Sequence, residues 1–284
     1  MLEVLIDTAV DSIKLLPFLF IAYVIMEYIE HKTSEKSKSI VQKSGKFGPF
    51  LGSILGIFPQ CGFSAMAANL YAGRIITLGT LIAIFLSTSD EMLPILLSEA
   101  VPFDIILKIL GIKLIIGMIA GVMIDFILRK FVKSEKEDKI SEVCEHEHCH
   151  CEEGGILKSS IKHTISVFIY IFIISLILNI VIYFIGEDNL ANFILNKPIL
   201  GPVLAGIIGL IPNCASSVLL TQLYLSGVIS VSTMISGLLV GAGVGILILC
   251  KVNKDIKENL KIIGLLYAVG VVAGILLEFV GITF

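Results

Sequence analysis

The sequence predicts an all-α integral membrane protein made of two inverted-topology repeats. Its 284 residues are 56% hydrophobic and only 16% charged, whereas about a quarter of the residues in a soluble domain are charged. The segments Gly48–Leu97 and Gly201–Cys250 also align without a gap and share a Pro-x-Cys-x-x-Ser motif at 59–64 and 212–217. Such an internal repeat indicates a duplicated architecture. In each repeat we expect three long transmembrane helices and a pair of short broken helices, which gives about ten membrane segments.

The first half contains three long apolar segments and two short ones. Spanning a bilayer takes roughly 20 apolar residues, so the short pieces on either side of the sequence PQCG cannot each cross alone. A lysine-rich loop, 31–46, separates the first segment from this pair. The apolar segments are, in order, Ile13–Tyr28, the short pieces Phe50–Phe58 and Ala65–Ala72, Ile75–Leu97 and Ile105–Leu128.

The second half repeats this plan after the polar stretch Arg129–Ser159. We therefore divide the chain into an N-terminal membrane repeat (1–129), a His/Cys-rich linker (130–160) and a C-terminal membrane repeat (161–284). The apolar segments of the second repeat are Ile165–Ile185, a short pair around the sequence PNCA, Val228–Cys250 and Ile262–Val280.

The distribution of Lys and Arg predicts the orientation, because these residues favour the cytoplasmic ends of helices. Loop 31–46, Arg74, residues 129–163 and the lysines of 251–261 then lie in the cytoplasm, whereas loop 98–104, which has no Lys or Arg, lies outside. Both termini lie outside, and the protein is a multi-pass protein of the plasma (inner) membrane. Each half crosses an odd number of times, so the repeats are inverted. Secondary transporters of this design bind their substrate at the repeat interface.

The Pro-x-Cys motifs provide the first candidate site residues. A thiolate at Cys61 or Cys214 is a soft metal ligand, and a helix N-terminus after each motif would stabilise it or an anionic substrate. Cys is also a common packing residue, and polar side chains can simply join transmembrane helices. The candidate substrate-binding residues are Pro59, Gln60, Cys61, Ser64, Asn69, Pro212, Asn213, Cys214, Ser217 and Gln222.

An acidic pair interrupts one predicted span. Ser89, Asp90 and Glu91 are candidate ion-coupling residues, because a carboxylate within the bilayer costs roughly 2.5–3.5 kcal/mol on insertion scales. The duplicate, Gly241–Val244, has no charge, which favours a cation ligand or proton carrier in one repeat alone. Placement near the outer interface is the alternative. Among the other charged residues near span ends, we expect Asp125 and Glu278 to be interfacial and Lys14, Lys108 and Lys113 to snorkel.

The linker contains a dense Cys and His cluster in an acidic tract. Such a composition is typical of metal binding, but the two-plus-two ligand spacing of a zinc finger is absent. We therefore expect a flexible cytosolic arm whose thiols stay reduced; a solvated linker without metal is the alternative. The candidate metal ligands are Cys144, His146, His148, Cys149, His150 and Cys151.

Four stretches together resemble a bacterial family of ten-segment heavy-metal exporters of the arsenic-efflux and manganese-transporter type. They are PQCGFSA at 59–65, STSDEMLP at 87–94, PNC at 212–214 and the His-rich linker. The resemblance covers nearly the whole chain and implies membrane transport of a heavy metal.

We therefore expect a secondary-active transporter, not an enzyme, that exports manganese, another divalent transition metal or an arsenic species. Because the Gly-rich ATP-binding motif ending in Lys-Ser/Thr is absent, we expect coupling to protons through Asp90 or Glu91. No cofactor is expected beyond a transported or linker-bound metal ion. The partners are the lipid bilayer and the metal, a homo-oligomer is compatible with the sequence, and no basic aromatic face indicates nucleic-acid binding.

Two alternatives remain open at this point. In the first alternative, the substrate is a small organic or anionic molecule, and the linker only senses metal. Otherwise the protein is a membrane thiol oxidoreductase that uses Cys61 and Cys214, although no Cys-x-x-Cys motif supports this chemistry.

Overall fold

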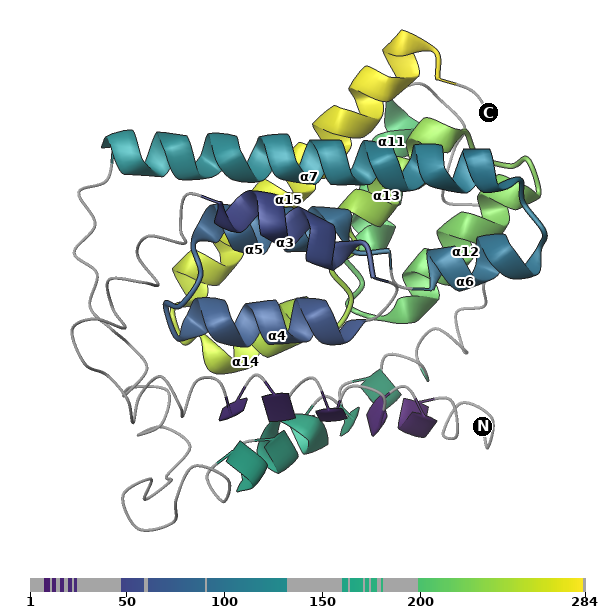
Figure 1. Ribbon diagram of the computed structural model, residues 1–284. Helices are drawn as coiled ribbons and strands as arrows, with labels where there is room; N and C mark the ends of the chain where they lie inside the picture. Colours follow the sequence, from purple (N-terminus) through teal and green to yellow (C-terminus); the bar gives the residue numbers. More distant parts are fainter. Residues whose placement is uncertain are drawn as a thin grey trace.

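The computed structural model describes residues 47–58, 61–89, 91–131 and 199–282, together with parts of 8–24 and 160–180 (Figure 1). Only the backbone of Cys61 and of residues 129–131 is described. The regular structure in these ranges is helical, and five stretches within them are long and apolar enough to cross a membrane. The predicted fold class, an all-α integral membrane protein, is therefore confirmed.

The helices of the two halves follow one another in the same order. Helices α4, α5, α6 and α7 each begin 153 residues before α12, α13, α14 and α15, as Cys61 and Cys214 illustrate, and α3 begins 152 residues before α11. The bounds are α3 Gly48–Gly56, α4 Cys61–Ala72, α5 Leu78–Ser87, α6 Met92–Ser98, α7 Phe103–Phe131, α11 Leu200–Gly209, α12 Cys214–Leu225, α13 Val231–Val240, α14 Gly245–Val252 and α15 Ile256–Val280. The inverted orientation of the halves in the membrane stays a prediction, as do the domain boundaries, because most of the linker lies outside the described residues.

Two predicted long spans are not continuous helices. The span expected over 75–97 is broken between α5 and α6, and the span expected over 228–250 is broken between α13 and α14. At the first break the backbone leaves the helical region at Thr88, with ψ of 128°; at the second, Gly243 has φ of +51°. Hydropathy does not detect such short interruptions, and Leu78–Ser98 and Val231–Val252 each remain a candidate span as a whole.

The two broken spans form the centre of the molecule. Their most apolar windows are 71% and 83% buried, compared with 33% for α7 and 28% for α15. In Figure 1, α7 extends along one side of α3 and α5, and α15 crosses behind them. Exposed apolar side chains of α7 and α15, such as Phe126 and Phe279, therefore suit contact with lipid.

The halves pack against each other by a reciprocal exchange of helices. Within each half, the first, third and fifth helices of the series pack together, as α3, α5 and α7 and as α11, α13 and α15. Between the halves, α14 packs on α4, and its counterpart α6 packs on α12. A two-fold relation between the copies produces such paired contacts.

Glycines allow the outer helices to approach the broken spans closely. A Cβ atom on Gly121 of α7 would lie 2.5 Å from the Gly79 carbonyl oxygen of α5. Its counterpart Gly274 on α15 is equally close to α13, because a Cβ there would lie 2.4 Å from the Ser236 Cβ. Small residues spaced four apart, here with Gly117 and Gly270, are a typical device for close helix packing in membranes.

Asp125 and its counterpart Glu278 cap the starts of the broken spans. The Asp125 carboxylate accepts hydrogen bonds from the Thr77 hydroxyl at 2.7 Å and the Gly79 amide at 2.9 Å. Glu278 accepts one from Ser230 at 2.8 Å. Both carboxylates therefore satisfy groups at a helix N-terminus, where negative charge is favourable. The prediction that they are simply interfacial missed this role, which both copies share.

Replacing Asp125 with Ala is expected to destabilise the α5–α7 contact by about 1–3 kcal/mol, because buried donors lose their acceptor. Thermal unfolding of the purified protein in detergent measures the effect. The control is Asp104→Ala on the same helix, whose exposed ion pair with Lys108 contributes at most about 1 kcal/mol. Equal melting temperatures for the two variants would contradict the capping role.

One ion pair joins the two halves at one end of the bundle. Arg74, after α4, makes two hydrogen bonds of 2.7 Å to Glu258 in the first turn of α15, and Tyr71 donates to the same carboxylate. Hydrogen bonding to Glu258 raises the pKa of Arg74 above its ordinary value. Arg74 has φ of +58°, a conformation for which the second copy uses Gly227 at +73°. The contact places Arg74 and the start of α15 on one side of the molecule, as the orientation prediction requires.

Candidate functional site

The two helix breaks lie next to each other and are joined by one side chain. Lys113, from the middle of α7, donates hydrogen bonds through Nζ to the Thr88 carbonyl at the end of α5 and to the Leu238 carbonyl of α13, the latter at 2.8 Å. Lys113 is fully buried, so the expectation that it snorkels to the interface is wrong. Its ammonium group instead lies at the boundary between the two halves.

The end of α3 is tied to the first break by one hydrogen bond. The Ser89 hydroxyl donates to the Ile57 carbonyl at the end of α3, at 2.6 Å. The rings of Phe58, which follows α3, and Phe63 of α4 lie 5.6 Å apart. Ser89 is buried, and its bond ties the segment between α5 and α6 to the segment between α3 and α4.

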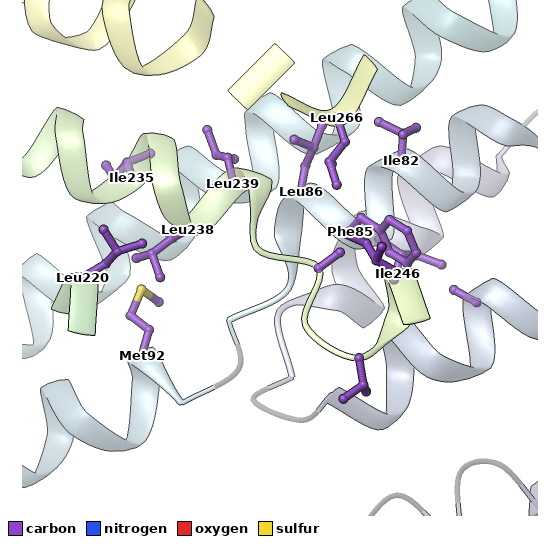
Figure 2. Packing of buried hydrophobic residues seen from close by; sticks show 14 of the residues in the cluster. Ile82, Phe85, Leu86, Met92, Leu220, Ile235, Leu238, Leu239, Ile246 and Leu266 are labelled. Atoms are coloured by element: carbon purple, nitrogen blue, oxygen red, sulfur yellow. The ribbon is translucent and has the colours of Figure 1, made fainter. Parts of the chain in front are cut away.

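The second break packs against α4 of the first half. A Cβ on Gly245, the first residue of α14, would lie 2.9 Å from the Ser64 Cβ and 3.0 Å from the Phe85 ring. Figure 2 shows the apolar residues around both breaks, with Phe85 beside Ile246 and Met92 of α6 directed toward Leu220. Packed apolar side chains therefore surround both breaks.

The second Pro-x-Cys motif begins a helix, as expected. Asn213 is the N-cap of α12, and its side-chain oxygen accepts from the Ala215 amide at 3.2 Å. Cys214 is half-buried in the first turn, and the Ser217 hydroxyl donates to the Cys214 carbonyl at 2.8 Å. Pro212, just before the cap, is half-buried. Helix α4 likewise begins at Cys61.

The two corresponding amides differ in environment. Asn69 of α4 is fully buried, and its amide nitrogen donates to the Ala65 carbonyl at 3.0 Å. Among the residues that the structure describes, its oxygen, Oδ1, has no hydrogen-bond partner, although an unpaired buried acceptor typically costs about 1–3 kcal/mol. This oxygen suits a polar or cationic ligand. Gln222, its counterpart on α12, is exposed.

Several candidate residues lie outside the described part of the chain. These are Pro59, Gln60, Asp90 and the side chain of Cys61, together with the linker residues Cys144, His146, His148, Cys149, His150 and Cys151. Glu91, next to Asp90, is half-buried at the N-cap of α6. Within the described ranges, no group of three or more His, Cys, Asp or Glu residues could hold a metal ion. The structure therefore leaves the ligand set and the thiol-redox alternative untested.

Comparison of the repeats would have found the residues that the sequence analysis missed. Lys113 aligns with Leu266 when the two repeats are superimposed in sequence. One copy therefore has a charge in a span where the other has an apolar residue. Asp125 faces Glu278, which indicates a shared structural role for these two carboxylates. Because only the first copy has a lysine at this position, the lysine indicates a role that is specific to one half.

The described fold defines a multi-pass α-helical membrane protein with paired helix breaks at its centre. The chain belongs to the ArsP_2 family, described as “Putative, 10TM heavy-metal exporter”, whose family model matches residues 1–185 and 131–247. No curated protein and no solved structure matches the chain significantly. The family resemblance expected from the sequence is confirmed, and the family description is that of a transporter of heavy metals rather than an enzyme.

Proposed function

We propose that the protein is a secondary-active transporter that exports a metal or metalloid ion across the plasma membrane in exchange for protons. The main support is the pair of helix breaks, which occur at equivalent positions in both copies and lie within reach of one lysine. Broken helices leave backbone groups unsatisfied, and in membranes such groups are tolerated where they line a site. Paired breaks at a repeat interface are typical of secondary transporters.

The reciprocal packing of the halves supports inverted repeats. Helices α3 and α4 are about 14 and 18 Å long at 1.5 Å per residue, so each is too short to cross a hydrocarbon core of about 30 Å. A hairpin of two such helices enters and returns on one side. The Pro-x-Cys turns of the two copies then approach the midplane from opposite sides. In this arrangement the candidate substrate ligands are the amides, hydroxyls and thiols around the turns.

Asp90 and Glu91 are proposed to couple metal movement to protons. A carboxylate binds either a metal ion or a proton, so exchange of the two at one group links their gradients. The acidic pair directly follows Ser89, which is hydrogen-bonded to the Ile57 carbonyl at the end of α3, and the second copy has Gly243-Val244 instead. This asymmetry favours a role in ion coupling over a structural one.

The proposed direction is export, because the positive-inside distribution of Lys and Arg predicts a cytosolic position for the Cys/His cluster of 144–151. There it would capture metal before transport. Carboxylate and amide oxygens suit Mn(II), thiolates suit arsenite, and imidazole with thiolate suits Zn(II), Ni(II) or Cu. The buried, unpaired Asn69 oxygen favours an ion that accepts oxygen ligands, such as Mn(II).

Flux measurements on proteoliposomes test this function. We expect the reconstituted protein to transport at least one ion of a panel of Mn, Zn, Co, Ni, Cu and arsenite. An imposed pH gradient should drive the flux, and a protonophore should abolish it. Flux that is indifferent to the pH gradient would contradict proton exchange, and no flux of any panel ion would contradict metal export.

A further inference from the structure

Lys113 is a fully buried cation at the centre of a membrane protein. Its side chain has no exposure to solvent. Inserting a lysine at the middle of a membrane helix costs at least about 2.5–3.5 kcal/mol on insertion scales. Two carbonyl groups, from Thr88 and Leu238, accept hydrogen bonds from its ammonium group. These contacts help to compensate for removing the charge from water.

The two carbonyls belong to the negative ends of two helices. Thr88 is the C-cap of α5, and Leu238 lies in the last turn of α13. Carbonyls in the last turn have no partner within their own helix, and the helix dipole gives them additional negative character. Because α5 and α13 come from different halves, one ammonium group neutralises a helix end from each copy.

The charged residues of this region occur in one copy only. Lys113 faces Leu266 in the repeat alignment, and the acidic pair Asp90-Glu91 faces Gly243-Val244. Leu266 is fully buried as well, so the position is in the core in both copies. A lysine needed only for packing would have an adequate replacement in leucine, as the second copy demonstrates. The lysine and the acidic pair therefore occur together in the first copy and are both absent from the second.

We propose that the Thr88 and Leu238 carbonyls form a cation site, that the Lys113 ammonium group is its tethered occupant, and that the transported cation displaces this group. The inference rests on the proposed function and adds one of its steps. Two cations at hydrogen-bond distance from the same oxygens repel each other strongly in a medium of low dielectric constant, so metal and ammonium group exclude one another. Displacement breaks the hydrogen bonds that Lys113 makes to both halves and so weakens one of the contacts between them.

Equilibrium metal binding by the full-length protein tests the displacement. Lys113→Met keeps a long apolar side chain and removes the competing charge. We expect this variant to bind the metal at least about tenfold more tightly, a change of about 1.4 kcal/mol. A lysine that served only structure would leave affinity unchanged or weaken it, and either result would overturn the displacement. The control is Lys108→Met, which removes an exposed lysine of the same helix and should leave affinity unchanged.

A second measurement tests the cation site without depending on metal transport. Lys113→Ala leaves a space that matches n-propylammonium, so this ion should raise the melting temperature of the variant more than sodium chloride at equal concentration. The matched variant Leu266→Ala opens a buried space at the corresponding position of the second copy, in the apolar core, and it should show no such preference. The absence of ammonium-specific stabilisation of Lys113→Ala would overturn the site. If the wild type binds no panel metal, the proposed function fails, while this measurement still decides the cation site.

Discussion

Asp90→Asn is expected to abolish metal resistance in a host that lacks its own exporters and to reduce flux in proteoliposomes at least about tenfold. Asparagine has nearly the same shape as aspartate but neither binds a proton near neutral pH nor supplies negative charge to a metal ion. If Asp90 carries the coupling ion, the variant loses both the ligand and the link to the pH gradient. Glu91→Gln should have a smaller effect, because Glu91, at the N-cap position of α6, is only half-buried.

The control for this prediction is Asp104→Asn, which removes an exposed carboxylate at the start of α7. That variant should transport at the wild-type rate. Surface expression has to be measured for all three variants, so that loss of folding is not counted as loss of transport. Full metal resistance of Asp90→Asn at normal expression would remove Asp90 from the mechanism.

Gly121→Val is expected to prevent the protein from folding correctly. A Cβ at this position would lie 2.5 Å from the Gly79 carbonyl oxygen, 2.8 Å from the Ala83 Cβ and 3.0 Å from the Pro49 Cβ. Since one of these atoms belongs to the backbone, α7 would have to move away from α5. Overpacking of this kind costs about 1–3 kcal/mol or more, and here it also displaces the helix that carries Lys113.

The matched control is Gly111→Ala on the same helix, because a Cβ there meets no atom within 4 Å. This variant should fold like the wild type or be slightly more stable, since alanine favours helix over glycine by about 1 kcal/mol. Yield, size-exclusion profile and thermal unfolding in detergent compare the two variants. A normally folded Gly121→Val would contradict the close α5–α7 packing.

Sequence reasoning predicted the all-α membrane fold and its family because the relevant signals are strong and local. Composition excludes a soluble domain, and apolar runs mark the spans. The repeat motif marks the short helices: α4 and α12 occur where the Pro-x-Cys motifs indicated, and they begin at Cys61 and Cys214. These features depend on residues that lie within about ten to twenty positions of one another in the sequence.

The breaks within the central spans escaped prediction because they depend on tertiary contacts. Residues 75–97 and 228–250 are apolar enough to appear continuous, and the unwound carbonyls are stabilised by Lys113 from a distant helix. Lys113 itself resembled a snorkelling lysine, since nothing nearby in the sequence shows which groups it reaches. The capping by Asp125 was missed for the same reason, because Thr77 and Gly79 are far away in sequence.

Metal binding by a chain from which residues 144–151 have been deleted tests the central claim most directly. The deletion removes the Cys/His cluster, so any remaining site must lie in the membrane part. We predict that one metal ion per chain still binds, and that Asp90→Asn combined with Glu91→Gln in the same background eliminates this binding. Loss of all metal binding on deletion of 144–151 alone would contradict a metal site at the helix breaks.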